Sequence, residues 1–95
     1  MTRVDVVIPA YGRQHLLGEA IASVQQQSLS DWHLWVIDDA SAEAVAIPSG
    51  ADSRVEIRRL PKNSGPAYAR NFGAALGKAP FIAFLDSDDL WFPDR

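Results

Sequence analysis

The chain has 95 residues, of which 47% are hydrophobic and 22% charged, and its formal net charge is −3. This balance is typical of a single soluble globular domain and excludes a disordered chain. The negative charge provides no basic face for nucleic acid, and the absence of Cys excludes disulfides and thiolate metal sites. No apolar run approaches ~20 residues and no signal-peptide pattern opens the chain, so we expect a cytoplasmic protein without a transmembrane segment.

The first two predicted elements are a strand over residues 4–8 and a helix over residues 14–27. The strand is almost entirely β-branched and ends at Pro9, a pattern typical of a parallel strand buried on both faces. In the helix, Leu17, Ala20, Ile21 and Val24 fall at i, i+3, i+4 and i+7. This spacing forms one apolar stripe facing a core.

A second strand is predicted over residues 34–37, running directly into Asp38 and Asp39. Residues 43–52 contain Pro48 and Gly50, which leave room only for a short helix or an irregular crossover. Residues 54–60 alternate between apolar and charged side chains, so we expect an edge strand whose charges protect it from pairing with another chain.

A second helix is predicted from the sequence Asn63-Ser64-Gly65-Pro66 to about Leu76. The polar residues before Pro66 are expected to cap its start, and Gly77 is the expected stop. A closing strand covers residues 81–85. Alternating strands and helices predict an α/β fold with an open, mostly parallel four-stranded sheet flanked by helices.

Three of the four predicted strands end in distinctive groups. The first ends in Pro9-Ala10-Tyr11, the second in Asp38-Asp39, and the last in Asp86-Ser87-Asp88-Asp89. Ligands bind beyond the carboxyl ends of such strands, where the strand order reverses. Tyr11 and residues 86–88 are therefore expected to share one crevice if the first and last strands are neighbours at the centre of the sheet. Carboxylates as close as those of the last loop repel unless some are protonated, well hydrogen-bonded or facing a cation, which makes this loop a candidate metal site.

Five motifs in this order resemble the family 2 glycosyltransferases. They are Val7-Ile8-Pro9-Ala10-Tyr11-Gly12, Ser23-Val24 with Gln27, Val36-Ile37-Asp38-Asp39-Ala40-Ser41, Ala69-Arg70-Asn71-Phe72-Gly73, and Phe84-Leu85-Asp86-Ser87-Asp88-Asp89. The resemblance implies a Rossmann-like GT-A half-domain and transfer of a sugar from a nucleotide diphosphate donor with inversion at the anomeric carbon. A UDP-sugar is the expected donor, and the acceptor is not identified.

The resemblance also implies roles for individual residues. Those expected at the nucleotide are Pro9, Tyr11, Asp38, Asp39, Arg70 and Asp86. Tyr11 would stack near the base, with Pro9 in the same wall. Asp39 would accept a hydrogen bond from the base, and Asp38 would support that loop or be purely structural.

Arg70 would lie near the nucleotide and Asp86 would face the ribose, again by resemblance. Asp88 would bind Mn²⁺ or Mg²⁺ at the diphosphate, with Asp89 as a second ligand or a supporting group. Carboxylate oxygens are the ligands that such hard cations prefer.

The chain departs from the family pattern at three places. Gly12 stands where Asn is usual, and Ala40 stands where Gly is usual, both in loops where we expect the change to be tolerated. The family continues past the position of Arg95 through an acceptor-binding half that carries the general base. Residues 1–95 are therefore expected to be a donor-binding half that lacks this base and does not turn over alone.

Two other functions stay open at this point. The first is a non-catalytic nucleotide-binding or interaction module that works with another chain or domain. The second is a phosphotransfer enzyme with Asp86 as nucleophile, although its motif would be expected near a first strand. An open sheet edge or the region of Trp91 is also expected to allow a homodimer.

Overall fold

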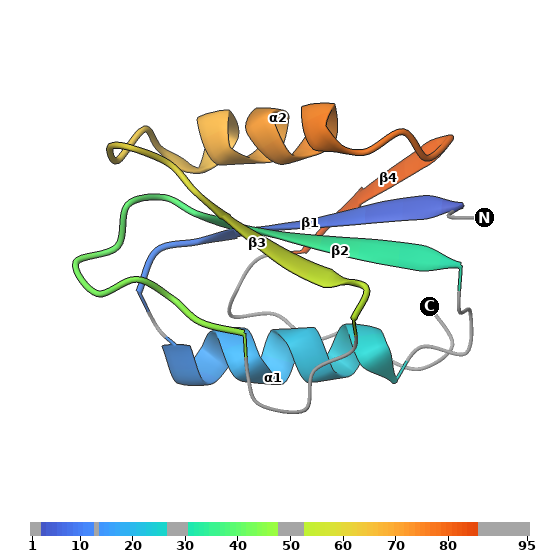
Figure 1. Ribbon diagram of the computed structural model, residues 1–95, viewed down its shortest axis with the longest axis horizontal. Helices are drawn as coiled ribbons and strands as arrows, with labels where there is room; N and C mark the ends of the chain where they lie inside the picture. The colour runs from blue at the N-terminus through green and yellow to red at the C-terminus, as the bar shows by residue number, and fades with distance from the viewer. Residues whose placement is uncertain (1–2, 13, 27–30, 48–52, 86–95) are drawn as a thin grey trace.

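The chain forms a parallel sheet with one helix on each face (Figure 1). The structure is a computed structural model that describes residues 3–12, 14–26, 31–47 and 53–85. Its elements are β1 (Val4–Ala10), α1 (Gln14–Gln25), β2 (Trp32–Asp38), β3 (Val55–Arg59), α2 (Pro66–Leu76) and β4 (Phe81–Phe84). The described strands have the order β3-β2-β1-β4, and every pairing among them is parallel. The first and last strands are therefore neighbours, but the last strand, β4, is at an edge of the described sheet and not at its centre.

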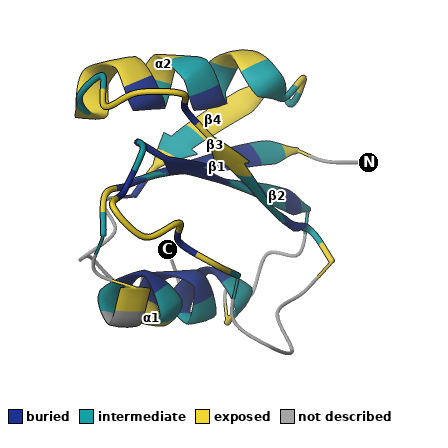
Figure 2. Ribbon diagram, turned by 60° about the vertical axis from the view of Figure 1, so that its left-hand side comes forward, coloured by how far each residue is buried: buried dark blue, intermediate teal, exposed yellow. Residues whose placement is uncertain are grey.

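The sheet separates two apolar layers, which explains the nearly continuous apolar runs of β1 and β2 (Figure 2). Successive side chains of β1 point to opposite faces, so Val6 and Ile8 pack on the α1 side and Val7 packs on the α2 side. The predicted stripe of α1 is confirmed, because its members are all buried in the first layer, namely Leu17, Ala20, Ile21 and Val24. The second layer contains Val7, Ile37, Leu60 and Ala69.

β1 continues through Pro9 to Ala10, where the sequence predicted that Pro9 would end the strand. The carbonyl of Val7 accepts from the amide of Leu85, after β4, and the carbonyl of Ala10 accepts from the amide of Asp39, after β2. Backbone groups alternate between the two sides, so the nitrogen of Pro9 faces the β4 side, beyond the last β1–β4 pair at Val7. The missing N–H of proline therefore removes no hydrogen bond between the described strands.

The interactions at the two ends of α2 differ from those predicted. Pro66 is at the first helical position, but Gly65 is the N-cap and no side chain caps it, so the expected polar cap is wrong. Gly77 follows the helix with φ −92° and ψ 170°, which is extended backbone open to any residue. Its lack of a side chain is needed for another reason: a Cβ there would overlap the carboxylate of Asp5.

Asp5 is a buried carboxylate that joins three segments, and its residue is only 3% exposed. It accepts hydrogen bonds from the indole Nε1 of Trp35 at 3.2 Å and from the amide of Ala79 at 3.0 Å. Asp5 lies on β1, Trp35 on β2, and Ala79 between α2 and β4. The close approach of Gly77 lets these segments meet.

One edge of the described sheet agrees with the sequence, and the other does not. β3 is an edge strand, as predicted, and β2 is longer than predicted because it begins at Trp32, which is buried in the α1-side layer. β4 forms the other edge, and its Phe81, Ile82 and Phe84 are exposed. Trp91 lies outside the described residues, so the expected dimer stays a prediction. Within the described segments, neither helix combines the length and apolar character needed to cross a membrane.

We predict that Gly77→Ala lowers the free energy of unfolding by about 2 kcal/mol, because the added methyl group must displace the buried Asp5 carboxylate from its donors. Chemical denaturation of the 95-residue chain measures this. Lys78→Ala, at the exposed neighbouring position, is the control and should change stability little. Equal unfolding midpoints for the two variants would contradict the role of Gly77.

Candidate functional site

The carboxyl ends of β1 and β2 meet at one edge of the sheet. Ala10 pairs with Asp38 in the register of the two strands, and the amide of Asp39 donates to the carbonyl of Ala10 at 2.8 Å. Tyr11 and Asp39 therefore follow adjacent strands at the same edge. Tyr11 is 58% exposed, so its ring is available to a ligand. We call the segments that meet here, residues 9–12, 38–41 and 63–65, the rim.

Asp39 is held by the loop that leads into α2. Its Oδ1 accepts from the amide of Ser64 at 2.8 Å, and its Oδ2 accepts from the amide of Gly65 at 2.9 Å and from Nδ2 of Asn63 at 3.3 Å. Nδ2 of Asn63 also lies 3.2 Å from the carbonyl oxygen of Asp39. The residue is only 3% exposed. The carboxylate thus sits at the amino end of α2, where backbone N–H groups and the helix dipole stabilise negative charge.

Asp38 is directed into the opposite layer and is fully enclosed by donors. Its Oδ1 accepts from the amide of Ser41 at 3.0 Å, and its Oδ2 accepts from the amide of Val45 at 3.1 Å and from the guanidinium of Arg59 at 2.7 Å. Burial by itself would raise the pKa of Asp38, but the hydrogen bonds from Ser41 and Val45 and the charge of Arg59 together hold it below its ordinary value. Asp38 is therefore an ionised anchor for the loop after β2.

Ser41 connects this anchor to the turn after β1. Its Oγ accepts from the amide of Gly12 at 2.7 Å, and its carbonyl accepts from Nη2 of Arg59 at 2.7 Å. Gly12 has φ 67°, a left-handed conformation that Gly and Asn both adopt readily, which explains why either residue suits this turn. Ala40 has φ 58° without being glycine, so this loop carries backbone strain.

The remaining predicted site residues fall into two groups. Pro9 is half-buried on β1, opposite Ile37 in the register, and Arg70 is half-buried on α2 beside the buried Ala69. Asp86, Asp88 and Asp89 lie outside the described residues. Within the part of the chain that the structure describes, no three His, Cys, Asp or Glu side chains cluster as metal ligands.

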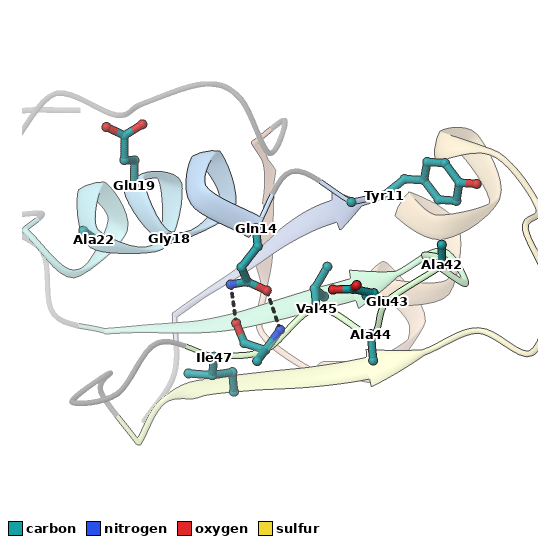
Figure 3. A pocket seen from close by; sticks show the side chains of 12 residues that line it. Tyr11, Gln14, Gly18, Glu19, Ala22, Ala42, Glu43, Ala44, Val45 and Ile47 are labelled. Atoms are coloured by element: carbon teal, nitrogen blue, oxygen red, sulfur yellow. Dashed lines mark hydrogen bonds between the residues drawn. The ribbon is translucent and has the colours of Figure 1, made fainter.

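A cavity of about 970 Å³ lies on the α1 face of the sheet and reaches the rim at Tyr11 and Gly12 (Figure 3). It is bounded by α1 and by residues 42–47, with the exposed Glu19 and Glu43 among its lining residues. The amide of Gln14 closes one side of it by bonding both backbone groups of Ala46, at 2.7 and 2.8 Å. The ring of Tyr11 points away from Gln14, and Asp39 is not among the residues that line this cavity.

Several residues in or bound to the rim were assigned other roles from the sequence. Asn63, Ser64 and Gly65 resembled a helix cap, but their donors serve Asp39. Arg59 was expected to guard the edge strand, whereas its guanidinium binds Asp38 and Ser41. Only the strand order, which places β3 and α2 beside the end of β2, could have indicated these contacts.

Comparison with known proteins gives one family for nearly the whole chain. A family model described as glycosyl transferase family 2 matches residues 5–95. The succinoglycan biosynthesis protein ExoW of Rhizobium meliloti is 42% identical over 105 residues, covering 100% of this chain and 32% of its own length. The UDP-Glc:alpha-D-GlcNAc-diphosphoundecaprenol beta-1,3-glucosyltransferase WfgD of Escherichia coli is 34% identical and is covered over 37% of its length, against 97% of this chain. The chain thus spans about a third of these relatives.

Solved structures share the fold at low sequence identity. S. aureus TarS in complex with UDP-GlcNAc matches with a TM-score of 0.79 at 22% identity, over 94% of this chain and 27% of that one. The mannosyltransferase PcManGT from Pyrobaculum calidifontis, in complex with GDP-Man and Mn²⁺, matches with a TM-score of 0.76 at 21% identity, over 94% and 28%. The predicted α/β fold class is confirmed, and the described sheet corresponds to the N-terminal part of a GT-A fold.

We predict that Asp38 gives the fold an acid-sensitive stability. Its folded-state pKa lies below the ordinary 3.8, so its contribution is present above that value and is lost as the pH falls through the folded pKa. Asp38→Asn should lose about 2 kcal/mol of unfolding free energy at pH 7 and show a flatter decline below pH ~4. Urea denaturation at several pH values tests this. Glu43→Gln, at an exposed site, should retain the slope of the unchanged chain; an equal slope for Asp38→Asn would refute the assignment.

We also predict that Ala40→Gly stabilises the chain. Glycine relieves a left-handed strain of about 1–2 kcal/mol but makes the unfolded chain more flexible, so a net gain of about 0.5–1 kcal/mol is expected. Ala42→Gly is the matched control, since Ala42 is exposed in the same loop and is not among the positive-φ residues. The control should lose stability or stay unchanged. A loss in Ala40→Gly as large as in Ala42→Gly would contradict the strain.

Proposed function

The chain belongs to the family 2 glycosyltransferases, and on that premise we propose that it supplies the donor-binding part of an enzyme that transfers a sugar from a nucleotide diphosphate with inversion. One observation carries the proposal. An exposed aromatic ring, Tyr11, and a carboxylate fixed in place, Asp39, follow adjacent strands at the carboxyl edge of the sheet. That edge is where open α/β sheets bind nucleotides.

The base of the donor would bind between these two groups. The ring of Tyr11 offers a stacking surface, which accepts any base because every base has a π-face. Asp39 would accept a hydrogen bond from the edge of the base, and its orientation is already set by the loop before α2. Because the site is ordered before the ligand arrives, little conformational entropy is lost on binding.

The other nucleotide residues have supporting roles. Pro9 would form a section of the wall behind Tyr11, and Arg70 on α2 would lie near the nucleotide. Asp38 would act through the loop that it anchors, since its carboxylate is filled by protein donors. Asp86 would face the ribose in the proposed complex.

A divalent cation completes the proposed donor site. Asp88 would hold Mn²⁺ or Mg²⁺, with Asp89 as a second ligand or a supporting group; their carboxylates are the hard oxygen donors that suit these ions. When bound, the ion would neutralise the negative charge that develops on the diphosphate.

The proposed donor is a UDP-sugar, and the acceptor has no assigned residue. TarS was solved with UDP-GlcNAc and WfgD is described as a glucosyltransferase for UDP-Glc, which supports a uridine donor here. The family match over residues 5–95 favours glycosyl transfer over the alternative of phosphotransfer from Asp86. None of the described residues is proposed as the general base.

We predict that UDP raises the melting temperature of the 95-residue chain and that Mn²⁺ increases this shift, because each ligand binds the folded state. At 100 times the dissociation constant the stabilisation is about 2.7 kcal/mol. Asp88→Ala should remove the increase due to Mn²⁺ and retain a response to UDP alone. Tyr11→Ala should reduce both responses because it removes the stacking surface.

Lys78→Ala serves as the control, because Lys78 is exposed just before β4, at the amino-terminal edge of the sheet and so opposite the rim. It should retain the full response to UDP and Mn²⁺. The absence of any response to nucleotide diphosphates in the unchanged chain would refute the proposed function. A full Mn²⁺ effect in Asp88→Ala would refute the metal assignment alone.

A further inference from the structure

Resting on the proposed function, we infer that Asn63 is a specificity-determining residue that selects a uracil-type base over guanine. Asn63 is exposed in the loop before α2, and its Nδ2 donates to Asp39 at 3.3 Å to Oδ2 and 3.2 Å to the carbonyl oxygen. The amide therefore lies across one side of the carboxylate proposed to recognise the base. The amide therefore limits how many hydrogen bonds a base can donate to Asp39.

The hydrogen bonds of Asp39 leave one acceptor position open. An ionised carboxylate has two oxygens with about four lone-pair sites. Oδ2 receives two protein donors, Gly65 N and Asn63 Nδ2, whereas Oδ1 receives one, Ser64 N. The small remaining exposure of the residue, 3%, is consistent with a single approach. A ligand therefore meets one free lone pair, on Oδ1.

The bases differ in what they can offer to that position. Uracil presents a single imide N–H between two carbonyl groups, which one acceptor satisfies. Guanine presents a ring N–H and an amino group side by side, a pair that matches both oxygens of a carboxylate. Oδ2 of Asp39 already accepts two hydrogen bonds from the protein, so it cannot accept a further one from guanine. The second N–H group of guanine would then face the NH₂ group of Asn63, which is also a donor, and would stay unpaired. An unpaired buried polar group is a strong source of discrimination.

The fold alone does not choose between these bases. TarS was solved with UDP-GlcNAc and PcManGT with GDP-Man, and both share the sheet described above. The choice therefore depends on the residues around the base and not on the fold. Ser64 and Gly65 bind Asp39 through backbone amides that any residue supplies, whereas Asn63 contributes through its side chain.

The test compares dissociation constants for UDP and GDP, measured by calorimetry with Mn²⁺ present. The unchanged chain should prefer UDP by at least about tenfold. Asn63→Ala, which frees Oδ2, should reduce this preference about tenfold, mainly through tighter binding of GDP. Asn63→Asp keeps the shape of the side chain but removes its donors, and should shift the preference in the same direction. Asn71→Ala removes the same amide from an exposed position of α2 and should leave the preference unchanged.

The outcomes separate this inference from the proposed function. Binding of neither nucleotide by the unchanged chain would refute both. A preference for UDP that Asn63→Ala and Asn63→Asp retain, or equal weakening of UDP and GDP, would overturn the inference and leave the proposed function standing. Tighter binding of GDP than UDP by the unchanged chain would overturn it as well. Melting curves of the variants confirm that each is folded when titrated.

Discussion

Two adjacent carboxylates at the end of β2 hold the rim together, one on each face of the sheet. Side chains alternate along a strand, so Asp38 shares the α1 face with Val36, and Asp39 shares the α2 face with Ile37. Each carboxylate is matched by backbone amides from a different loop. The enclosed charges would be costly without these donors, and with them they fix the loops on both sides.

The architecture was predictable because its signals are periodic and local. Continuous β-branched runs indicate strands covered on both faces, and the stripe that includes Leu17 indicates a helix on one of them. Element ends were less predictable because they depend on neighbours distant in the sequence. Pro9 lies inside β1 because no described strand needs its amide, and Gly77 is required by the carboxylate of Asp5, near the opposite end of the chain.

The site was predictable in its location but not in its internal contacts. Tyr11 and Asp39 each follow a predicted strand, so they were expected at one edge of the sheet, and the register of β1 with β2 brings them together. The hydrogen-bond donors to Asp39 could not be predicted from the sequence. The segment from Asn63 to Pro66 has the same local pattern whether it caps a helix or binds an acidic residue distant in the sequence. The acidic loop after β4 lies outside the described residues, so its role still rests on the family pattern.

Pro9 limits how far β1 can form backbone hydrogen bonds on its β4 side. A strand on the β4 side of β1 can accept a hydrogen bond from the amide of every second residue of β1 before Pro9. Pro9 has no N–H, so it cannot donate the next hydrogen bond. Neither cooling nor a change of side chains on the neighbouring strand can restore this hydrogen bond. Hydrogen bonding on this side of β1 therefore cannot continue through Pro9, which precedes by two residues the exposed ring of Tyr11, at which the donor base is proposed to stack.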